Sequence, residues 1–269
     1  MWWKRGGIGN VRILFIGDIV GQRGVDYLGS QLQEILAEHE PDLVVANAEN
    51  AVQGRGLTAR VAEELFDAGI ELVTLGNHAF DQREVLSVLA SDRRVIRPAN
   101  YPSGTPGLGF TTCRVNGLEV LLVNLMGRAF MNPIDCPFQT VDALLKEHST
   151  IRHVVVDMHA EATSEKLAMG WYLDGRVSAV LGTHTHVPTA DERILPSGTG
   201  YITDVGMVGP RDGILGMDKD AVIRRFRTQL PTRFEVAKGA RQLCAVFLDI
   251  ADETGKTNRI SRIFRAEDS

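Results

Sequence analysis

Polar side chains that can bind divalent metals follow several apolar runs of this 269-residue sequence. They are Asp18, Glu49 with Asn50, Asn77 with His78, His159, and His184 with His186. Carboxylate oxygen, amide oxygen and imidazole nitrogen are all ligands of divalent transition metals. Burying such groups without partners would cost several kcal/mol each, so a shared positive charge is needed to satisfy them. The set therefore predicts a metal centre, and two ions bridged by one carboxylate would match its size.

The histidine pair and the turn after residues 72–75 indicate how these side chains reach one place. Thr185 separates His184 from His186, and residues two apart in extended backbone point to the same face. We therefore expect both rings to enter one cavity. Asn77 follows an apolar run that is typical of a buried strand. Because ligands of open α/β sheets bind beyond the carboxyl ends of strands, the turn predicts a site at the mouth of a sheet.

Taken singly, each candidate has an ordinary structural explanation. An aspartate after a strand, such as Asp18, is commonly a helix cap or a turn former. Asn77 alone would be a turn residue with positive φ, and His159 alone would be a hydrogen-bonded, half-buried side chain. The agreement of residue type, order and strand-end position is what favours a metal centre. The histidines that lack this pattern, His39, His148 and His153, are assigned to the surface.

The apolar patterns also predict the elements that position these residues. Strands are expected over residues 11–16, 42–46, 72–75, 154–156 and 179–181, each shortly before candidate ligands. Helices are expected over residues 24–39, 58–68, 81–89, 139–147, 163–173 and 218–227. Strands that alternate with helices pair in parallel through right-handed crossovers, so the fold class is α/β.

The organisation of the chain changes after about residue 95. Residues 111–115 and 118–125 are expected to form a hairpin through Asn116-Gly117. Residues 198–216 are expected to be a glycine-rich loop, and short strands are predicted over residues 244–250 and 259–264. No repeat or linker divides the chain. We therefore expect a flexible N-terminal extension over residues 1–10 and a single domain over residues 11–269.

Composition excludes several classes of function. The net charge of −5 provides no basic surface for extended nucleic-acid binding, and 44% hydrophobic residues allow a substantial core. Three scattered cysteines, Cys113, Cys136 and Cys244, indicate reduced thiols and a cytoplasmic location rather than a disulfide framework. No apolar run approaches the ~20 residues of a membrane helix, and the start lacks the features of a signal peptide. No membrane partner is expected.

The order of the motifs resembles that of the calcineurin-like metallophosphoesterases. The motifs are Gly17-Asp18, Asn47-Ala48-Glu49-Asn50, Gly76-Asn77-His78, Asp157-Met158-His159 and Gly182-Thr183-His184-Thr185-His186. Two departures from the superfamily pattern point to its bacterial YmdB-type phosphodiesterase branch: Val20 stands where a histidine is usual, and Glu49 where an aspartate is usual. The resemblance implies a four-layer αββα sandwich of two mixed β-sheets flanked by helices, with the site at one end.

The resemblance also implies a role for each candidate ligand. Asp18, Asn50 and His186 would hold one metal, and Asn77, His159 and His184 would hold the other, with Glu49 as the bridge. His78 would point toward the leaving group as the catalytic general acid. Asp157 or Glu161 would orient a ligand imidazole, although either could instead cap a helix. Iron or manganese is favoured as the metal, with zinc as the alternative.

The implied reaction is hydrolysis of a small phosphodiester, with a cyclic nucleotide such as 2′,3′-cyclic AMP as the favoured substrate. Metal-activated hydroxide would attack phosphorus while His78 protonates the leaving oxygen. A phosphomonoesterase, a nuclease or a regulatory nucleotide-binding protein with weak hydrolysis would use the same metal centre. Arg55, Arg128 and Arg211 lie in loops from which they could meet phosphate or simply face solvent. A homo-oligomer is implied as well, with a tetramer as the favoured assembly.

Overall fold

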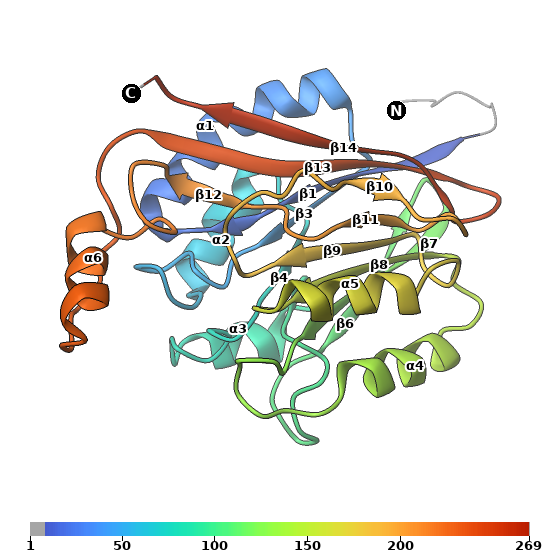
Figure 1. Ribbon diagram of the computed structural model, residues 1–269. Helices are drawn as coiled ribbons and strands as arrows, with labels where there is room; N and C mark the ends of the chain where they lie inside the picture. The colour runs from blue at the N-terminus through green and yellow to red at the C-terminus, as the bar shows by residue number, and fades with distance from the viewer. Residues whose placement is uncertain (1–8, 269) are drawn as a thin grey trace.

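Two mixed β-sheets face each other in the computed structural model, which describes residues 9–268 (Figure 1). The first sheet has the order β2-β12-β13-β1-β3-β4-β5, with β14 paired to β13. The second has the order β10-β11-β9-β8-β7-β6. The first sheet is built from β1 (Asn10–Ile16), β2 (Asp18–Ile19), β3 (Leu43–Asn47), β4 (Leu72–Thr74), β5 (Val95–Ile96), β12 (Met207–Pro210), β13 (Arg241–Ala251) and β14 (Thr257–Ala266). The second is built from β6 (Phe110–Val115), β7 (Leu118–Met126), β8 (His153–His159), β9 (Ala179–Thr183), β10 (Arg193–Ile194) and β11 (Gly200–Ile202).

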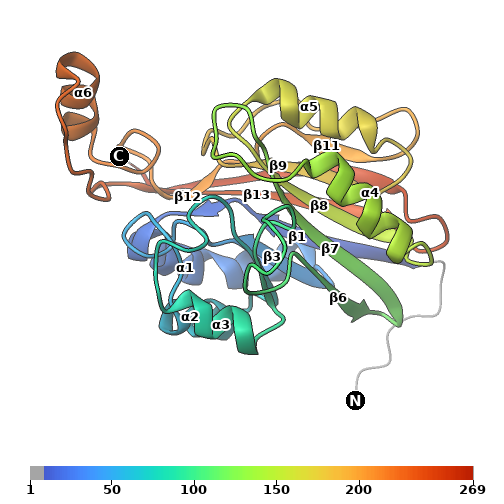
Figure 2. The same ribbon diagram turned by 90° about the horizontal axis from the view of Figure 1, so that it is seen from below.

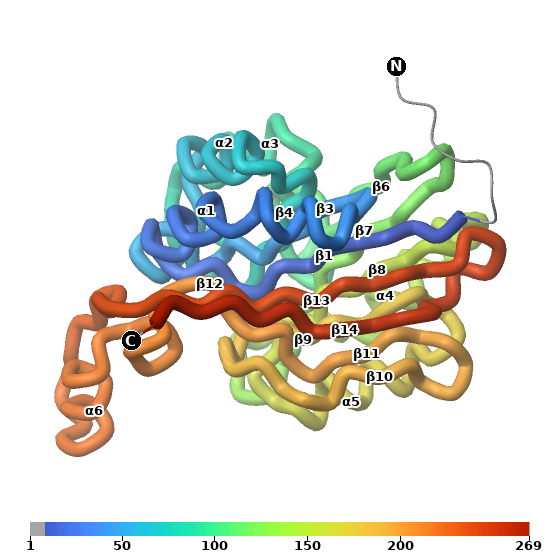
Figure 3. The backbone as a smooth tube through the Cα atoms, turned by 90° about the horizontal axis from the view of Figure 1, so that it is seen from above, coloured from blue at the N-terminus to red at the C-terminus, as the bar shows by residue number. Residues whose placement is uncertain are grey.

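Helices cover the outer faces of both sheets, so the layers follow the predicted order αββα (Figure 2). The first sheet is covered by α1 (Gly21–His39), α2 (Ala59–Ala68) and α3 (Val85–Ser91). The second is covered by α4 (Pro137–Glu147) and α5 (Thr163–Tyr172). Helix α6 (Lys219–Thr228) stands away from both sheets, beyond the end of β12 (Figure 3).

Alternation along β1 shows how one strand serves two cores. Ile13 and Phe15 pack in the cluster between the sheets, whereas Leu14 and Ile16 pack beneath the helices. Successive side chains of a strand point to opposite faces, so a strand buried on both faces must be continuously apolar. The run in β1 meets this requirement and explains why the sequence pattern identified the strand.

The strand directions are those the sequence predicts around the site. Strands β1, β3, β4 and β5 are parallel to their neighbours in that order, as are β7, β8 and β9. The β6–β7 hairpin turns through Asn116 (φ 51°) and Gly117 (φ 87°), the left-handed pair required by a tight two-residue turn. The carboxyl ends of β3, β4, β8 and β9 therefore lie at one end of the sandwich.

Several sequence-based boundaries were wrong. Helix α1 begins at Gly21 rather than residue 24, and α3 begins at Val85 rather than residue 81. The expected loop over residues 198–216 contains β11 and β12, which are too short and glycine-rich to show an apolar pattern. Asn10 is already part of β1, and the rest of the predicted extension, apart from Gly9, lies outside the described residues.

The surface assignment of three histidines also needs correction. His153 is the first residue of β8 and is only 3% exposed, so it is a core residue. His39 and His148 are half-buried, and their rings pack against those of Phe247 and Phe110.

Within residues 9–268, no helix is both long and apolar enough to cross a membrane.

Candidate metal centre

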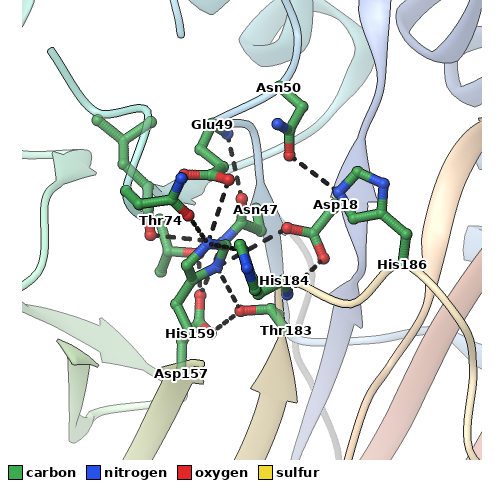
Figure 4. Close-up of polar contacts among 12 residues, drawn as sticks. Asp18, Asn47, Glu49, Asn50, Thr74, Asp157, His159, Thr183, His184 and His186 are labelled. Carbon is green, nitrogen blue, oxygen red and sulfur yellow. Dashed lines mark hydrogen bonds and ion pairs between the residues drawn. The ribbon is translucent and has the colours of Figure 1, made fainter. Parts of the chain in front are cut away.

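Six of the seven predicted ligands lie together where strands of both sheets end (Figure 4), and the seventh, Asn77, contacts His159. Asp18 begins β2 and His159 ends β8, while the others lie in the turns that follow β3, β4 and β9. Asp18, Glu49 and His159 are at most 1% exposed. The fold therefore brings residues up to 168 positions apart in the sequence to one buried cluster, as their strand-end positions predict.

His159 is the centre of the first group of polar atoms. Its Nε2 lies 3.1 Å from Glu49 Oε1, 3.0 Å from Asn77 Oδ1 and 3.1 Å from His184 Nδ1. Within the described chain, Glu49, His159 and His184 form a cluster of ligand atoms able to hold one metal ion. One proton on Nε2 cannot donate to three partners at once, whereas a cation placed among them is bound by all of them.

A buried hydrogen-bond chain fixes the orientation of the His159 ring. Thr183 donates its hydroxyl proton to Asp157 Oδ1 at 2.6 Å, so its oxygen accepts from His159 Nδ1 at 2.9 Å. Asp157 is held in turn by Asn47 and by Thr74. With the proton on Nδ1, the lone pair of Nε2 is directed into the cluster, as a metal-binding imidazole requires.

The other two imidazoles are oriented by the same principle. His184 Nε2 lies 3.0 Å from Glu161 Oε2, which leaves Nδ1 facing His159. His186 donates from Nδ1 to the carbonyl of Leu215 at 3.1 Å, which leaves Nε2 facing Asn50. Each ring thus has one nitrogen held by an acceptor and the other free for a ligand bond.

Asn50 and His186 form a second group. Asn50 donates its amide to the carbonyl of Gly54 at 3.0 Å, so its Oδ1 is turned toward His186 Nε2, 3.2 Å away. The carboxylate of Asp18 accepts from the backbone N–H of His184 at 3.1 Å, and its Oδ1 is 3.8 Å from His159 Nδ1. Asp18 therefore contacts residues of the first group, although the resemblance assigned it to the metal held by Asn50 and His186.

The loop that carries the two histidines is not extended. His184 has φ 93° and His186 has φ 62°, both in the left-handed region that costs a residue with a side chain about 1–3 kcal/mol. The prediction that an extended backbone directs both rings into one cavity is therefore wrong in its geometry. The turned backbone sends the two rings to different groups.

Three observations fit a bound cation at this cluster. Asp18 Oδ1 is buried and has no hydrogen-bond partner, which is costly for a carboxylate oxygen unless a cation satisfies it. His159 Nε2 and His184 Nδ1 face each other at 3.1 Å. The other nitrogen of each ring is bonded to Thr183 or to Glu161. A Cβ at Gly76 would collide with His159 Nε2 and Glu49 Oε2, so a glycine is needed there to leave room for these ligand atoms.

Without a metal, the buried groups balance part of one another's charge. Burial raises the pKa of Asp18 well above its ordinary value, although the charge of His159 opposes the shift. Burial also disfavours charge on Glu49 and His159, yet their mutual attraction dominates, lowering the pKa of Glu49 to about 2 and raising that of His159 to about 9. Burial and the His159 charge lower the pKa of His184 to about 3, so this ring is neutral at pH 7.

His78 is placed differently from the ligands. Its backbone N–H donates to Glu49 Oε2 at 2.8 Å, whereas the Nδ1 of its ring lies 2.8 Å from Asp81 Oδ2, which is not a candidate ligand. Among residues 9–268, nothing bonds to the other ring nitrogen, Nε2. The ring is thus oriented by an acid at one nitrogen and has the other available for proton transfer.

Sequence reasoning missed several residues that support the site. Asp81 was predicted to start a helix, but its carboxylate contacts the His78 ring. The three-residue spacing of the two side chains is the sequence feature that could have indicated this contact. Asn47, Thr74 and Thr183 were quoted in or beside motifs without a role. Asp157 and Glu161 were predicted to orient a ligand imidazole: Glu161 contacts His184 directly, and Asp157 reaches His159 through Thr183. Neither caps α5, whose N-cap is Ala162.

The three loop arginines are distributed unequally. Arg55 lies 3.9 Å from Asp81, beside His78. Arg128 and Arg211 are exposed, and no contact within the described chain joins either to the candidate ligands.

An αββα sandwich with nitrogen and oxygen ligands at the strand ends defines the metallophosphoesterase class of fold. A family model described as "YmdB-like protein" matches residues 14–263, and the chain belongs to this family. It is 49% identical over 259 residues to the 2′,3′-cyclic-nucleotide 2′-phosphodiesterase of Bacillus subtilis, covering 96% of this chain and 98% of that protein.

Solved structures agree with the fold. A crystal structure of a phosphatase from Mycoplasma pneumoniae matches with a TM-score of 0.94 and 34% identity, over 97% of this chain and 95% of that one. A putative 5′-nucleotidase from Staphylococcus aureus matches with a TM-score of 0.63 and 12% identity, over 97% of this chain and 55% of that chain. The second likeness concerns the fold alone, and both structures confirm the predicted fold class. The family model and the Bacillus subtilis relative confirm the predicted family.

Proposed function

We propose that this protein is a dinuclear-metal phosphodiesterase that hydrolyses small cyclic nucleotides, with 2′,3′-cyclic AMP as the favoured substrate. The coarser class, a hydrolase of phosphoester bonds, is confirmed by the curated relatives. The observation that carries the proposal is the arrangement of the three imidazoles. Each has one nitrogen bonded to an acceptor and the other facing another candidate ligand: Asn77 and Glu49 for His159, His159 for His184, and Asn50 for His186.

Two sets of residues would hold the metals. His159, His184 and Asn77 would serve one position, while Asn50 and His186 would serve the other. In this proposal Asp18 would complete the second set, and Glu49 would be shared by both sets. When bound, divalent cations would offset the charge of the phosphate oxygens and lower the pKa of water toward neutrality. Manganese or iron suits these nitrogen and oxygen ligands, with zinc as the alternative.

The remaining step of the proposal is proton transfer by His78. A water molecule gives up one proton to solvent as its oxygen adds to phosphorus, and the bond from phosphorus to the ribose oxygen breaks. The departing oxygen takes a proton from His78 Nε2, while Asp81 holds Nδ1 and fixes the ring. His78 is 21% exposed at the edge of the cluster, which gives it access to a bound substrate.

The substrate is the finer part of the proposal. The Bacillus subtilis relative is named for cleavage at the 2′ position of 2′,3′-cyclic nucleotides. We therefore propose that the product is a nucleoside 3′-phosphate. A nuclease acting on long duplexes is disfavoured by the net charge of −5.

A regulatory nucleotide-binding protein with weak hydrolysis is the rival hypothesis. The His78–Asp81 pair favours the enzyme, because binding a nucleotide alone needs no oriented proton donor. The cytoplasmic location and the homo-oligomeric, tetrameric assembly stay predictions.

The two hypotheses are separated by one assay. Protein loaded with Mn²⁺ is incubated with 2′,3′-cyclic AMP, and the products are resolved by chromatography. Conversion to a single nucleoside monophosphate with multiple turnovers supports the phosphodiesterase. Saturable binding without turnover supports the regulator. Release of inorganic phosphate from a nucleoside monophosphate, without opening of the cyclic diester, supports the phosphomonoesterase.

A further inference from the structure

A buried ion pair lies directly beneath the loop that carries two of the candidate ligands. Lys166 of α5 and Asp204, which follows β11, are both 0% exposed, with Nζ 2.7 Å from Oδ2. Neither belongs to the metal cluster or to the proton-transfer pair. We propose that this pair sets the separation of the two metal positions by clamping Thr185, the residue between His184 and His186. The inference rests on the proposed dinuclear function.

The contacts of the clamp converge on Thr185. Asp204 Oδ2 accepts from the backbone N–H of Thr185 at 3.1 Å and from its hydroxyl at 2.6 Å. Lys166 Nζ lies 3.3 Å from the same hydroxyl oxygen. The backbone N–H and the side chain of the half-buried Thr185 are therefore both bound by one buried charged pair.

Backbone conformation shows why this loop needs a clamp. His184 (φ 93°) and His186 (φ 62°) are both left-handed, an arrangement that persists only where surrounding contacts impose it. Thr185 is the only residue between them. His184 faces His159, and His186 faces Asn50, so the conformation of this segment determines how far apart the two groups of ligands lie.

Neighbouring residues accommodate the pair and extend its reach. A Cβ at Gly182 would collide with the carbonyl oxygen of Thr203 and would lie 2.9 Å from Lys166 Cδ, so the glycine leaves room for both the neighbouring backbone and the lysine stem. Asp204 Oδ1 accepts from the backbone N–H of Gly206 at 2.8 Å. The carbonyl of Gly206 in turn accepts from the N–H of Asp18 at 3.0 Å. The clamp thus reaches candidate ligands on two different segments.

Stability alone does not account for a fully buried pair of opposite charges. Replacing such a pair with packed apolar residues is often neutral or stabilising, because desolvation offsets the attraction. A positional role explains why charged groups, with directional bonds to Thr185, occupy this place. Lys166 and Asp204 are accordingly positioning residues, which act through the loop and touch neither metal nor substrate.

The test measures metal binding and the magnetic interaction between two bound ions. Chelated protein is titrated with Mn²⁺ and followed by calorimetry and electron paramagnetic resonance. The variants are Thr185→Val, which removes the clamped hydroxyl, and Lys166→Met/Asp204→Asn, which removes both charges together so that neither is left unpaired. Thr185→Ser is the conservative variant, because serine retains the hydroxyl. Arg176→Met is the matched control. It breaks the ion pair between Arg176, which precedes β9, and Asp142 of α4, and this pair lies at the opposite end of β9 from the site.

The wild type and Arg176→Met are expected to bind two Mn²⁺ with an exchange-coupled spectrum. Thr185→Val and the double variant are expected to fold, to bind the second ion about 10–100-fold more weakly and to lose the coupled spectrum, which Thr185→Ser retains. Wild-type coupling in both folded clamp variants would overturn the inference and leave the proposed function intact. A wild type that binds only one ion would overturn both.

Discussion

The Nδ1 of His78 lies 2.8 Å from Oδ2 of Asp81, three residues further along the same turn. The backbone N–H of His78 is bound at the same time by Glu49 of the metal cluster. In the turn after β4, the backbone of the candidate proton donor is therefore hydrogen-bonded to a candidate metal ligand, and its ring is bonded to Asp81. Asn77 contacts His159, whereas the ring of His78 contacts Asp81, so consecutive residues of this turn have different partners in the site.

Removal of the proton donor should affect turnover without removing the metals. His78→Ala is expected to lower kcat for 2′,3′-cyclic AMP by about 10²–10⁴-fold, the usual contribution of a general acid. Metal content, measured by elemental analysis, should stay at the wild-type level because the ring contacts none of the ligands. His39→Ala is the matched control. Wild-type turnover in metal-replete His78→Ala protein would exclude the role.

Loss of the orienting carboxylate should have a smaller effect. Asp81→Asn keeps the size of the side chain but no longer holds the His78 ring with a charge, and misplacement of a catalytic group costs up to about 10²-fold. We expect a fall in kcat of about 10–100-fold with little change in KM, measured by steady-state kinetics. Asp92→Asn, at the end of α3, should behave as the wild type. A rise in KM with unchanged kcat would instead indicate that Asp81 contacts the substrate.

The residues that orient the imidazoles should control metal affinity. Thr183→Val removes the acceptor of His159 Nδ1 and keeps the shape of the side chain. Glu161→Ala removes the partner of His184 Nε2 at a half-exposed position. Each is expected to weaken Mn²⁺ binding by about 10–100-fold in calorimetric titrations of chelated protein. Glu63→Ala on α2 is the control, and unchanged affinity in both variants would contradict the assigned ring orientations.

Stability of the chelated protein should depend on the proton of His159. Its pKa is raised to about 9 in the fold, above the ordinary value of 6.5, because the attraction of Glu49 outweighs burial. This contribution is fully present below about pH 6.5 and is lost as the pH rises through 9. The melting temperature should therefore fall between pH 6.5 and 9, and Mn²⁺, which replaces the proton, should reduce the fall. Calorimetry would contradict this if His159→Gln melted with the same pH dependence.

The parts of the site that follow a strand could be predicted from the sequence. Apolar runs identified β1, β3, β4, β8 and β9, and the parallel arrangement then placed the ends of these strands together. The ligand types added a chemical reason for convergence, because buried carboxylate, amide and imidazole groups need a shared cation. These two local signals sufficed to bring the seven candidate ligands to one cluster.

Features that depend on packing between distant segments could not be predicted. The charge of Lys166 gives no sign of complete burial, because its partner Asp204 is 38 residues away. The left-handed backbone of His184 and His186 is imposed by surrounding contacts rather than by residue type. His153 was misplaced because a histidine at the start of a strand has no apolar signal of its own. Sequence pattern thus identifies ligands, while tertiary contacts decide how they are held.

The central claim is that two bound metals make this cluster catalytic. The most direct measurement is the rate of 2′,3′-cyclic AMP hydrolysis by chelated protein as Mn²⁺ is added in known molar ratios. We predict no turnover without metal, a rise that reaches its plateau at two equivalents, and no rise in His159→Ala. Full turnover in the chelated protein, or a plateau at one equivalent, would contradict the dinuclear account.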